Sequence, residues 1–147
     1  MAAYRLKNIF VQGPIEPGFI ASSIQAHQEK TNIGGHSIFL GQVRADAINE
    51  REVTAIEYTT YESLALETMA VIREEIILKY QLDCMHVYHS LGNVLAGKIC
   101  LFVFTSSAHR APAINACNET VERIKAELPI WGKEIFADYS YQWKENT

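Results

Sequence analysis

The chain has 147 residues, of which 48% are hydrophobic and 20% are charged, and this predicts a single globular domain over residues 1–147. Its net charge of −4, without blocks of basic residues, argues against a general nucleic-acid-binding protein, because such proteins need a basic surface. The longest strongly apolar run, Ile99 to Phe104, is too short to cross a bilayer, and the N-terminus lacks the apolar segment of a signal peptide. We therefore expect a cytoplasmic protein.

In the first part of the chain, the hydrophobic pattern predicts strands around one helix. Residues 4–12 alternate weakly, as in an edge strand, and residues 18–30 have apolar side chains near one face of a helix. Residues 36–43 and 53–58 predict the next strands. Arg44 ends the first of these, and from the sequence alone an exposed arginine that closes a strand is the simplest interpretation.

The middle of the chain predicts a long helix and then a pair of strands. The helix runs from Glu62 to Tyr80, and its buried stripe is formed by Ala65, Met69, Ile72, Ile76 and Tyr80. Residues 84–89 and 98–105 predict the strands, joined by a turn-like segment at 91–97. The second strand is nearly all apolar, so we expect it at the centre of a sheet, covered on both faces.

A second clear helix ends near Leu128. Pro112 suits its first turn, and Pro129 disfavours helical geometry in the residue before it. Arg110 should lie just outside its N-terminus, and Lys125 in its last turn. Its apolar stripe is expected to contain Ile114, Cys117, Val121, Ile124 and Leu128. With more strands than helices, the predicted class is α+β, a largely antiparallel sheet with two main helices packed on it.

The residue types that could bind a metal show no ligand spacing. Cys84, Cys100 and Cys117 are odd in number and form no C-x-x-C pair, so we expect small buried hydrophobic residues rather than a zinc site. His86 and His89 are three apart on a predicted strand, and their side chains should point to opposite faces. They cannot share a metal, and neither is assigned a role.

The N-terminus of the second clear helix is a candidate anion site, because free N–H groups and the helix dipole lie there beside His109 and Arg110. Lys125 is about 22 Å farther along the helix. One small anion therefore cannot contact both Arg110 and Lys125 in one chain, and a shared site would need a second copy. The simpler alternative is that His109 and Arg110 cap the helix and pair with a surface carboxylate, while Lys125 is solvated.

Several motifs resemble the large, catalytic subunit of molybdopterin synthase. They are SAHR at Ser107–Arg110, K-A-E-L-P-I-W at Lys125–Trp131, FLGQVR at Phe39–Arg44, and the Y-x-x-Y of Tyr58 and Tyr61. The resemblance covers residues 35–143, most of the chain. It implies a single α+β domain of the α/β-hammerhead type.

The resemblance also implies an activity and partners. In that family, a small ubiquitin-like subunit ending in Gly-Gly carries a C-terminal thiocarboxylate, which enters a pocket on the large subunit. Its sulfur is transferred to cyclic pyranopterin monophosphate to form the dithiolene of molybdopterin. Two large subunits form a central homodimer, with one small subunit at each end. We expect no metal or organic cofactor.

Six residues take roles by this resemblance. Lys125 and Lys133 are the expected catalytic residues, and the expected substrate-binding residues are Arg44, His109, Arg110 and Glu134. Arginines and a histidine suit a cyclic phosphate, and a lysine can neutralise the thiocarboxylate, transfer protons or act as a nucleophile. Glu134 could shuttle protons or accept the N–H groups of the pterin.

Three positions depart from the family pattern: the second lysine after the tryptophan, the arginine expected after His89, where this chain has Ser90, and the glutamate expected after Tyr58, where it has Thr59. A second lysine usually follows the tryptophan directly, whereas this chain has Gly132 there and Lys133 one step later. Lys133 could substitute only if the glycine lets the backbone turn, because adjacent residues of an extended segment point to opposite sides. Gly132 therefore keeps a second interpretation open, a non-catalytic docking module for a ubiquitin-like sulfur carrier or a pterin phosphate. A third interpretation, a purely structural homodimer, would give no common role to Arg44, His109, Arg110 and Lys125.

Overall fold

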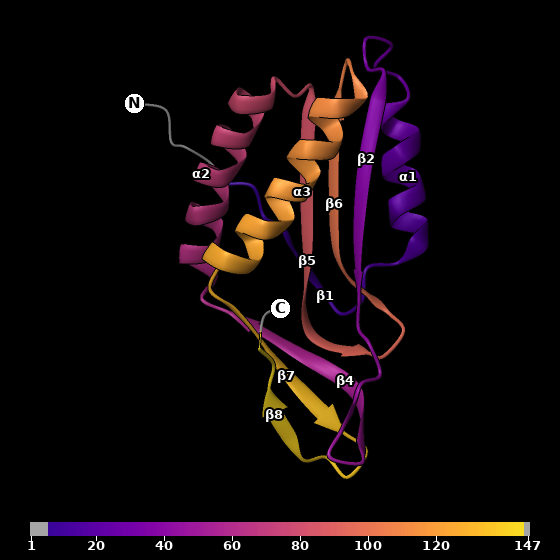
Figure 1. Ribbon diagram of the computed structural model, residues 1–147, viewed down its shortest axis with the longest axis vertical. Coiled ribbons are helices and arrows are strands. Elements are labelled where there is room, and N and C mark those ends of the chain that lie inside the picture. The colour runs from indigo at the N-terminus through magenta and orange to yellow at the C-terminus, as the bar shows by residue number, and fades with distance from the viewer. Residues whose placement is uncertain (1–5, 146–147) are drawn as a thin grey trace.

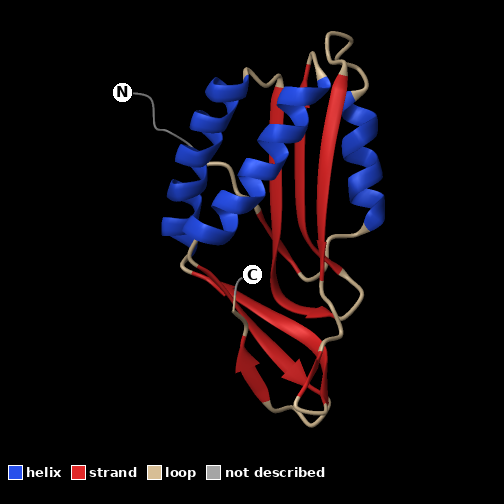
Figure 2. Ribbon diagram, viewed as in Figure 1, coloured by secondary structure: helices blue, strands red, loops and turns tan. Residues whose placement is uncertain are grey.

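The computed structural model describes residues 6–145, which form eight strands and three helices (Figures 1 and 2). The helices are α1 (Pro17–His27), α2 (Glu62–Tyr80) and α3 (Arg110–Glu127). The strands are β1 (Phe10–Gln12), β2 (Gly35–Gln42), β3 (Ala47–Ile48), β4 (Arg51–Thr60), β5 (Cys84–Leu95), β6 (Ile99–Ser107), β7 (Ile130–Phe136) and β8 (Tyr141–Trp143). None of the helices in this range is long and apolar enough to span a membrane.

The sheet has the order β2-β6-β5-β4-β7-β8, and neighbours along this path are antiparallel. β1 joins β5 in parallel, and β3 pairs with β4. Within β5 the partner changes, because residues 84–89 pair with β6 and residues 92–95 pair with β4. Gly92 lies at this change with φ of 80°, a conformation that favours glycine. The sheet thus has an upper part flanked by helices and a lower part of β4, β7 and β8 (Figure 1).

The upper part of the sheet is covered on both faces. Leu101 and Val103 of β6 belong to the main core, which also contains the buried residues of α2 and α3. Phe102 and Phe104, which point the other way, pack with Ile20 of α1 in a second core. The prediction that this apolar strand is central is therefore confirmed, as is the α+β class with a largely antiparallel sheet.

The long helix was predicted with the bounds that α2 has. Ala65, Met69, Ile72 and Ile76 are buried, whereas Tyr80 is half-buried. The helix ends where Gln81 adopts a left-handed conformation with φ of 51°. The helix expected at residues 18–30 is α1, which spans residues 17–27 and flanks the sheet with the two main helices.

The buried face of α3 differs from the prediction at one position. Ile114 is 53% exposed, whereas the small residues Ala113 and Ala116 are fully buried. The Thr105 hydroxyl of β6 donates to the carbonyl oxygen of Ala113 at 2.7 Å, so the helix approaches the sheet closely at this point. Cys117 is also buried. Close packing through small side chains turns Ile114 outward, a detail that periodicity does not show.

Two segment boundaries were predicted wrongly. The turn expected at 91–97 is a continuation of β5 to Leu95, because Gly92 bends the strand without ending it. The edge strand expected at 4–12 begins at Phe10, and its first two residues, Tyr4 and Arg5, lie outside the described range. The segment after β7 joins the sheet through the pairing of β8 with β7, whereas the aromatic side chains of Tyr141 and Trp143 are each 56% exposed.

Candidate active site

A pocket of about 280 Å³ lies where the two parts of the sheet meet, at the C-terminal end of α3. Its walls come from the end of β2, from β4 to β7 and from the last turn of α3. The lining combines apolar side chains with a set of polar ones: Gln42, Arg44, Asp46, Tyr58, His89, Lys125, Glu134 and Lys144. Such a mixture, apolar walls with a few polar groups, is typical of a site for a small ligand.

Three of the six expected site residues meet in this pocket. Lys125 comes from the last turn of α3, Glu134 from β7 and Arg44 from the segment after β2. The helix places its lysine near its C-terminus, where a cation also interacts favourably with the dipole. These three residues bring two cationic side chains and one carboxylate from separate parts of the chain into the pocket.

Arg44 lies at the mouth of the pocket, and its side chain is 76% exposed. Its Nε donates to Oδ1 of Asp46 at 2.7 Å, and its second guanidinium nitrogen donates to Oδ2 at 3.3 Å. An exposed ion pair of this kind contributes little net stability. A phosphate or carboxylate ligand could therefore displace Asp46 as the partner of the guanidinium with little loss of free energy, since Arg binds such groups in the same forked geometry.

Glu134 forms a buried part of the pocket wall. Only 6% of the residue is exposed, and Nε2 of Gln142 in β8 donates to Oε1 at 3.3 Å. A buried acidic side chain needs polar partners, because its charge is poorly solvated. A ligand with N–H groups, such as a pterin ring, would supply further donors to this carboxylate.

His89 presents a neutral imidazole to the pocket. Its Nδ1 lies 2.8 Å from the carbonyl oxygen of Ser90, and because a carbonyl only accepts, Nδ1 must carry the hydrogen. Burial lowers the pKa of His89 to about 4; the Ser90 hydrogen bond opposes this shift and the charge of Lys125 adds to it. The other nitrogen, Nε2, therefore has a free lone pair at neutral pH.

Tyr58 and Cys100 complete the buried wall next to His89. The rings of Tyr58 and His89 meet edge to face with centroids 5.0 Å apart. Burial raises the pKa of Tyr58 well above its usual range, and Cys100 and Glu134 add to the shift. Burial also raises the pKa of Cys100. Both groups stay protonated, so Tyr58 is a donor in the pocket and Cys100 has the buried, unreactive character expected from the sequence.

Lys133 does not line this pocket. β7 keeps a regular pairing with β4 across Gly132, so Lys133 points to the face opposite Glu134. Its ammonium group lies 4.3 Å from the ring centroid of Tyr141 and 5.4 Å from that of Trp143. The backbone turn at Gly132 that would bring Lys133 into the site is absent from the described strand. The structure therefore does not bring the second expected catalytic lysine to the pocket.

His109 and Arg110 lie at the opposite end of α3 from Lys125. Arg110 is the first residue of the helix rather than just outside it, and His109 is its N-cap. Both side chains are exposed, and neither lines the pocket. With about 1.5 Å of rise per residue, Arg110 and Lys125 remain about 22 Å apart along the axis. The structure thus keeps the separation that made a second copy necessary for a shared site.

Comparison with known proteins decides the family. Residues 14–127 match the family model described as "MoaE protein", which is more than half of the chain. This chain belongs to the MoaE family. Members of this family with curated names include a "Molybdopterin synthase catalytic subunit" of Aspergillus niger, which is 33% identical over 133 residues, 90% of this chain and 71% of that protein.

Other relatives are longer than this MoaE family member. The protein of the same name from Oryza sativa subsp. indica is 36% identical over 120 residues, 82% of this chain and 61% of that protein. The one from Drosophila willistoni is 35% identical over 116 residues, 77% of this chain and 31% of that protein. The chain thus spans less than two thirds of the length of these two relatives.

Solved structures share the fold. The crystal structure of molybdopterin synthase from Staphylococcus aureus superposes with a TM-score of 0.78 at 28% identity, covering 92% of this chain and 95% of that one. A complex of subunits 1 and 2 of molybdopterin-converting factor from Helicobacter pylori gives a TM-score of 0.79 at 19% identity, covering 92% of this chain and 88% of that one. The latter likeness concerns the fold alone.

The MoaE motifs in the sequence did not point to every polar residue of the pocket. His89 and Lys144 were missed, and Tyr58 was noted only as part of a motif. The backbone N–H of Lys144 donates to the carbonyl oxygen of Gly132 at 2.8 Å, which brings this residue beside β7. The opposite orientation of His86 and His89, which the sequence did predict, was the available signal that one of them could face a site.

Proposed function

We propose that this chain is the catalytic subunit of a molybdopterin synthase and transfers sulfur from the thiocarboxylated C-terminus of a small ubiquitin-like subunit to cyclic pyranopterin monophosphate. The observation that carries the proposal is the pocket in which Lys125, Arg44 and the buried Glu134 meet, in a member of the MoaE family. The names of the relatives and of the S. aureus structure support it.

The residues of the pocket suit the chemistry of each transfer. In each transfer a carbon–sulfur bond forms at a pterin carbon while a carbon–oxygen bond at that carbon breaks, and the displaced oxygen leaves on the opened phosphate ester or as water. The carbon–sulfur bond of the thiocarboxylate breaks as well, and the carrier is left with an ordinary carboxylate whose second oxygen comes from water. Lys125 neutralises the thiocarboxylate and stabilises negative charge that develops during transfer. The same ammonium group can donate a proton, and the neutral amine that remains after proton loss can act as a nucleophile.

The buried wall of the pocket orients the pterin. Glu134 accepts hydrogen bonds from the N–H groups of the ring, and the protonated Tyr58 hydroxyl donates to an acceptor. The free Nε2 of His89 accepts a further hydrogen bond. These groups lie on strands rather than loops, which holds them in fixed geometry. The sulfur transfer itself needs no metal or organic cofactor in this proposal.

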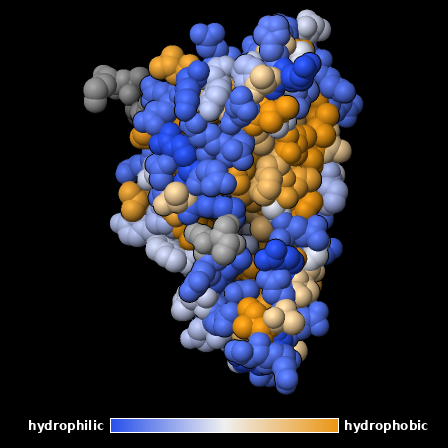
Figure 3. Space-filling model, in the orientation of Figure 1, coloured by the Kyte–Doolittle hydropathy of each residue, from blue (hydrophilic) through white to orange (hydrophobic). Residues whose placement is uncertain are grey.

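A homodimer would supply the phosphate-binding residues. In this arrangement, His109 and Arg110 of a second copy reach the mouth of the pocket, where they and Arg44 bind the cyclic phosphate. Within residues 6–145, β2 is an edge strand with no partner on its outer side, and its Phe39 and Leu40 are 36% and 41% exposed. Figure 3 shows an apolar surface over β2 beside α3. The same two residues line the pocket, so an interface there would adjoin the site.

The small subunit is the second proposed partner. Its flexible Gly-Gly tail would enter the pocket and place the thiocarboxylate near Lys125, giving a heterotetramer with one small subunit at each end of the homodimer. The H. pylori complex of subunits 1 and 2, which shares the fold, supports a two-protein assembly. The chain has a net charge of −4, which would repel an anionic tail, so the site that binds the tail needs local positive charge. Arg44, Lys125 and Lys144 in the lining of the pocket supply that charge.

A turnover assay tests the proposal directly. The chain is mixed with a thiocarboxylated small subunit and cyclic pyranopterin monophosphate, and dithiolene formation is measured with the carrier's loss of sulfur. We expect product, with two carriers consumed per pterin. If the carrier binds with no loss of sulfur, the chain is a docking module and the catalytic proposal is wrong.

A further inference from the structure

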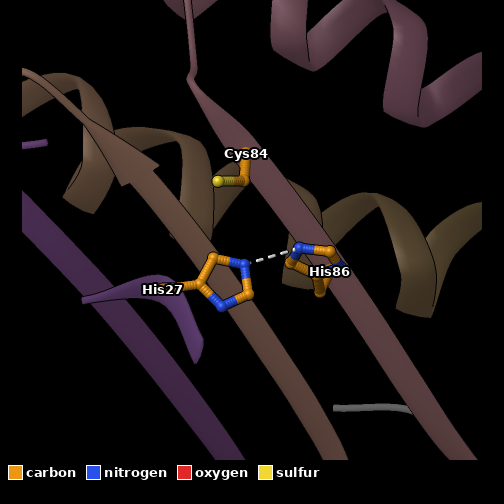
Figure 4. A group of neighbouring side chains, drawn as sticks. All are labelled: His27, Cys84 and His86. Atoms are coloured by element: carbon orange, nitrogen blue, oxygen red, sulfur yellow. Dashed lines mark hydrogen bonds between the residues drawn. The ribbon is translucent and has the colours of Figure 1, made fainter. Parts of the chain in front are cut away.

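A second group of reactive side chains lies outside the pocket, between α1 and β5. Cys84 and His86 are two apart on β5 and share one face of the strand, and His27 at the end of α1 lies against that face (Figure 4). The Sγ of Cys84 and one ring nitrogen of each histidine all lie within 4.8 Å of one another. Cys84 is buried, and both imidazoles are half-buried.

The two imidazoles face each other through their Nε2 atoms, which are 2.8 Å apart. The Nδ1 of His27 lies 2.7 Å from the carbonyl oxygen of Ser23, so Nδ1 carries the hydrogen and Nε2 has a free lone pair. The ammonium group of Lys7 lies 2.7 Å from Nδ1 of His86, so it donates to this nitrogen and the His86 hydrogen is on Nε2. A single hydrogen therefore lies between two imidazole nitrogens.

Hydrogen bonds from the surroundings hold two of these groups in place. The bond to Ser23 fixes the tautomer and the ring orientation of His27, as an outer hydrogen bond commonly does for histidine ligands. The ammonium group of Lys30 donates to Sγ of Cys84 at 3.2 Å, and a zinc ion would bind this sulfur as a thiolate. This set of one sulfur and two imidazole nitrogens matches the ligands that zinc prefers.

We propose that His27, Cys84 and His86 bind a zinc ion. Tetrahedral zinc with bonds of about 2.0–2.1 Å to nitrogen and 2.3 Å to sulfur separates its ligand atoms by roughly 3.3–3.6 Å. The Nε2 atoms must therefore move apart by about half an ångström from 2.8 Å, and the sulfur must approach the histidines. The ion takes the place of the hydrogen between the rings. Water occupies its fourth position.

The zinc ion would act as a structural link rather than as part of the pocket. His86 and His89 point to opposite faces of β5, so the ion lies on the α1 side of the sheet, away from Lys125. Ile20 is the one residue of α1 that is fully buried. A metal bond from His27 to β5 would therefore anchor a helix with a small apolar contact, independently of the proposed sulfur transfer.

The sequence concealed this site because its ligands come from distant positions. In the sequence, the cysteines form no metal-binding pattern and His86 has no ligand partner at a suitable spacing. The expectation that His86 and His89 cannot share a metal still holds, but α1 supplies His27 instead. Only the packing of α1 on β5 brings the three ligands together.

Lys7 competes with the ion, and this gives a distinctive prediction. For His86 to bind zinc through Nε2, its hydrogen has to move to Nδ1, where Lys7 now donates. Lys7 is exposed and can turn into water. Lys7→Met removes both the competing donor and a positive charge, so it should tighten zinc binding. If Lys7 only made a structural contact with His86, its removal would not tighten zinc binding.

Metal titration of the untagged, chelator-treated full chain tests the proposal. We expect one zinc ion per chain in competition with a chromophoric chelator, and with cobalt a sulfur-to-metal charge-transfer band. Cys84→Ser should abolish this band and weaken binding by more than the roughly 10–100-fold typical of changes around a metal site. Cys117→Ser, at another buried free cysteine, should keep both the charge-transfer band and the affinity for zinc.

His27→Gln gives a second test that does not depend on a buried position. It should weaken zinc binding as Cys84→Ser does, and circular dichroism should show that each variant is folded. Zinc should also raise the Tm of the unaltered chain but not of these variants. Failure to bind stoichiometric zinc, binding unaffected by Cys84→Ser, or equal loss in Cys117→Ser would overturn the proposal.

Discussion

Tyr58 lies directly opposite Gly132 in the antiparallel pair of β4 and β7, and its ring occupies the space that a side chain at position 132 would need. A Cβ atom there would lie 3.0 Å from Cγ2 of Ile56 and 3.3 Å from Cε1 of Tyr58. The absence of a side chain at Gly132 therefore leaves the room that the Tyr58 ring occupies. The lysine that the family pattern would put at 132 is replaced here by an aromatic wall.

Gly132→Ala should destabilise the chain. The added methyl group is too close to the buried Ile56 and to the Tyr58 ring, and overpacking of this kind typically costs about 1–3 kcal/mol of unfolding free energy. Gly18→Ala in α1 is the control, since a Cβ there has nothing within 4 Å and alanine favours a helix. Urea unfolding measures both. Equal stability of Gly132→Ala and the unaltered chain would contradict the packing described.

Lys125→Ala should lower turnover by at least about 100-fold, because it removes the ammonium group that stabilises charge and transfers protons. The dimer should remain intact, which size-exclusion chromatography can verify. Lys79→Ala on α2, where the lysine pairs with Glu119 at the surface, is the control and should keep near-normal turnover. Near-normal turnover of Lys125→Ala would remove this residue from the catalytic role.

Mixed dimers test whether the sites are shared between copies. Arg110→Ala should mainly weaken substrate binding. When Arg110→Ala chains are mixed with Lys125→Ala chains, each heterodimer should regain one complete site, because one copy supplies Lys125 and the other supplies Arg110. Random mixing should restore about a quarter of the full turnover, since half of the dimers are mixed and each has one working site of two. Without any recovery, His109 and Arg110 cannot act across the dimer.

Lys133 and Lys144 should differ in their effects. Lys133→Ala should keep most of the turnover, because its ammonium group lies over Tyr141 and Trp143 and not in the pocket, and it should lose about 0.5–1 kcal/mol of cation–π stabilisation. Lys144→Ala should reduce turnover, because this residue lines the pocket. Measurement of kcat/KM and of urea unfolding for the two variants shows which lysine acts in turnover and which only in stability. A larger loss of turnover in Lys133→Ala would reverse the assignment.

His89 should make stability dependent on pH. Burial lowers its pKa from 6.5 to about 4, so between these values the unfolded chain binds a proton that the folded chain does not. The contribution of the neutral His89 to the unfolding free energy is complete above about pH 6.5 and is lost as the pH falls toward 4. In His89→Gln the fall in unfolding free energy over this range should be shallower. An identical pH dependence in the variant would show that His89 is not buried and neutral.

Local patterns were enough to predict most of the elements. The spacing of Ala65, Met69, Ile72 and Ile76 predicted α2, and the apolar run of β6 predicted a central strand, because periodicity and hydrophobicity act over a few residues. The pattern failed at Ile114 and at Gly92. In both places, contact with another element decides: the close approach of α3 to the sheet turns Ile114 outward, and the change of partner strand keeps β5 continuous at Gly92.

The sequence by itself determined the α+β class, the motifs of the MoaE family and the distance between the two ends of α3, since these depend on neighbouring residues or on helix geometry. Only the tertiary structure decided which side chains meet. It put Lys125 and Glu134 in one pocket, turned Lys133 away from it, and brought His27 to Cys84 and His86. Such contacts depend on strand register and helix packing across long stretches of chain, which no local pattern specifies.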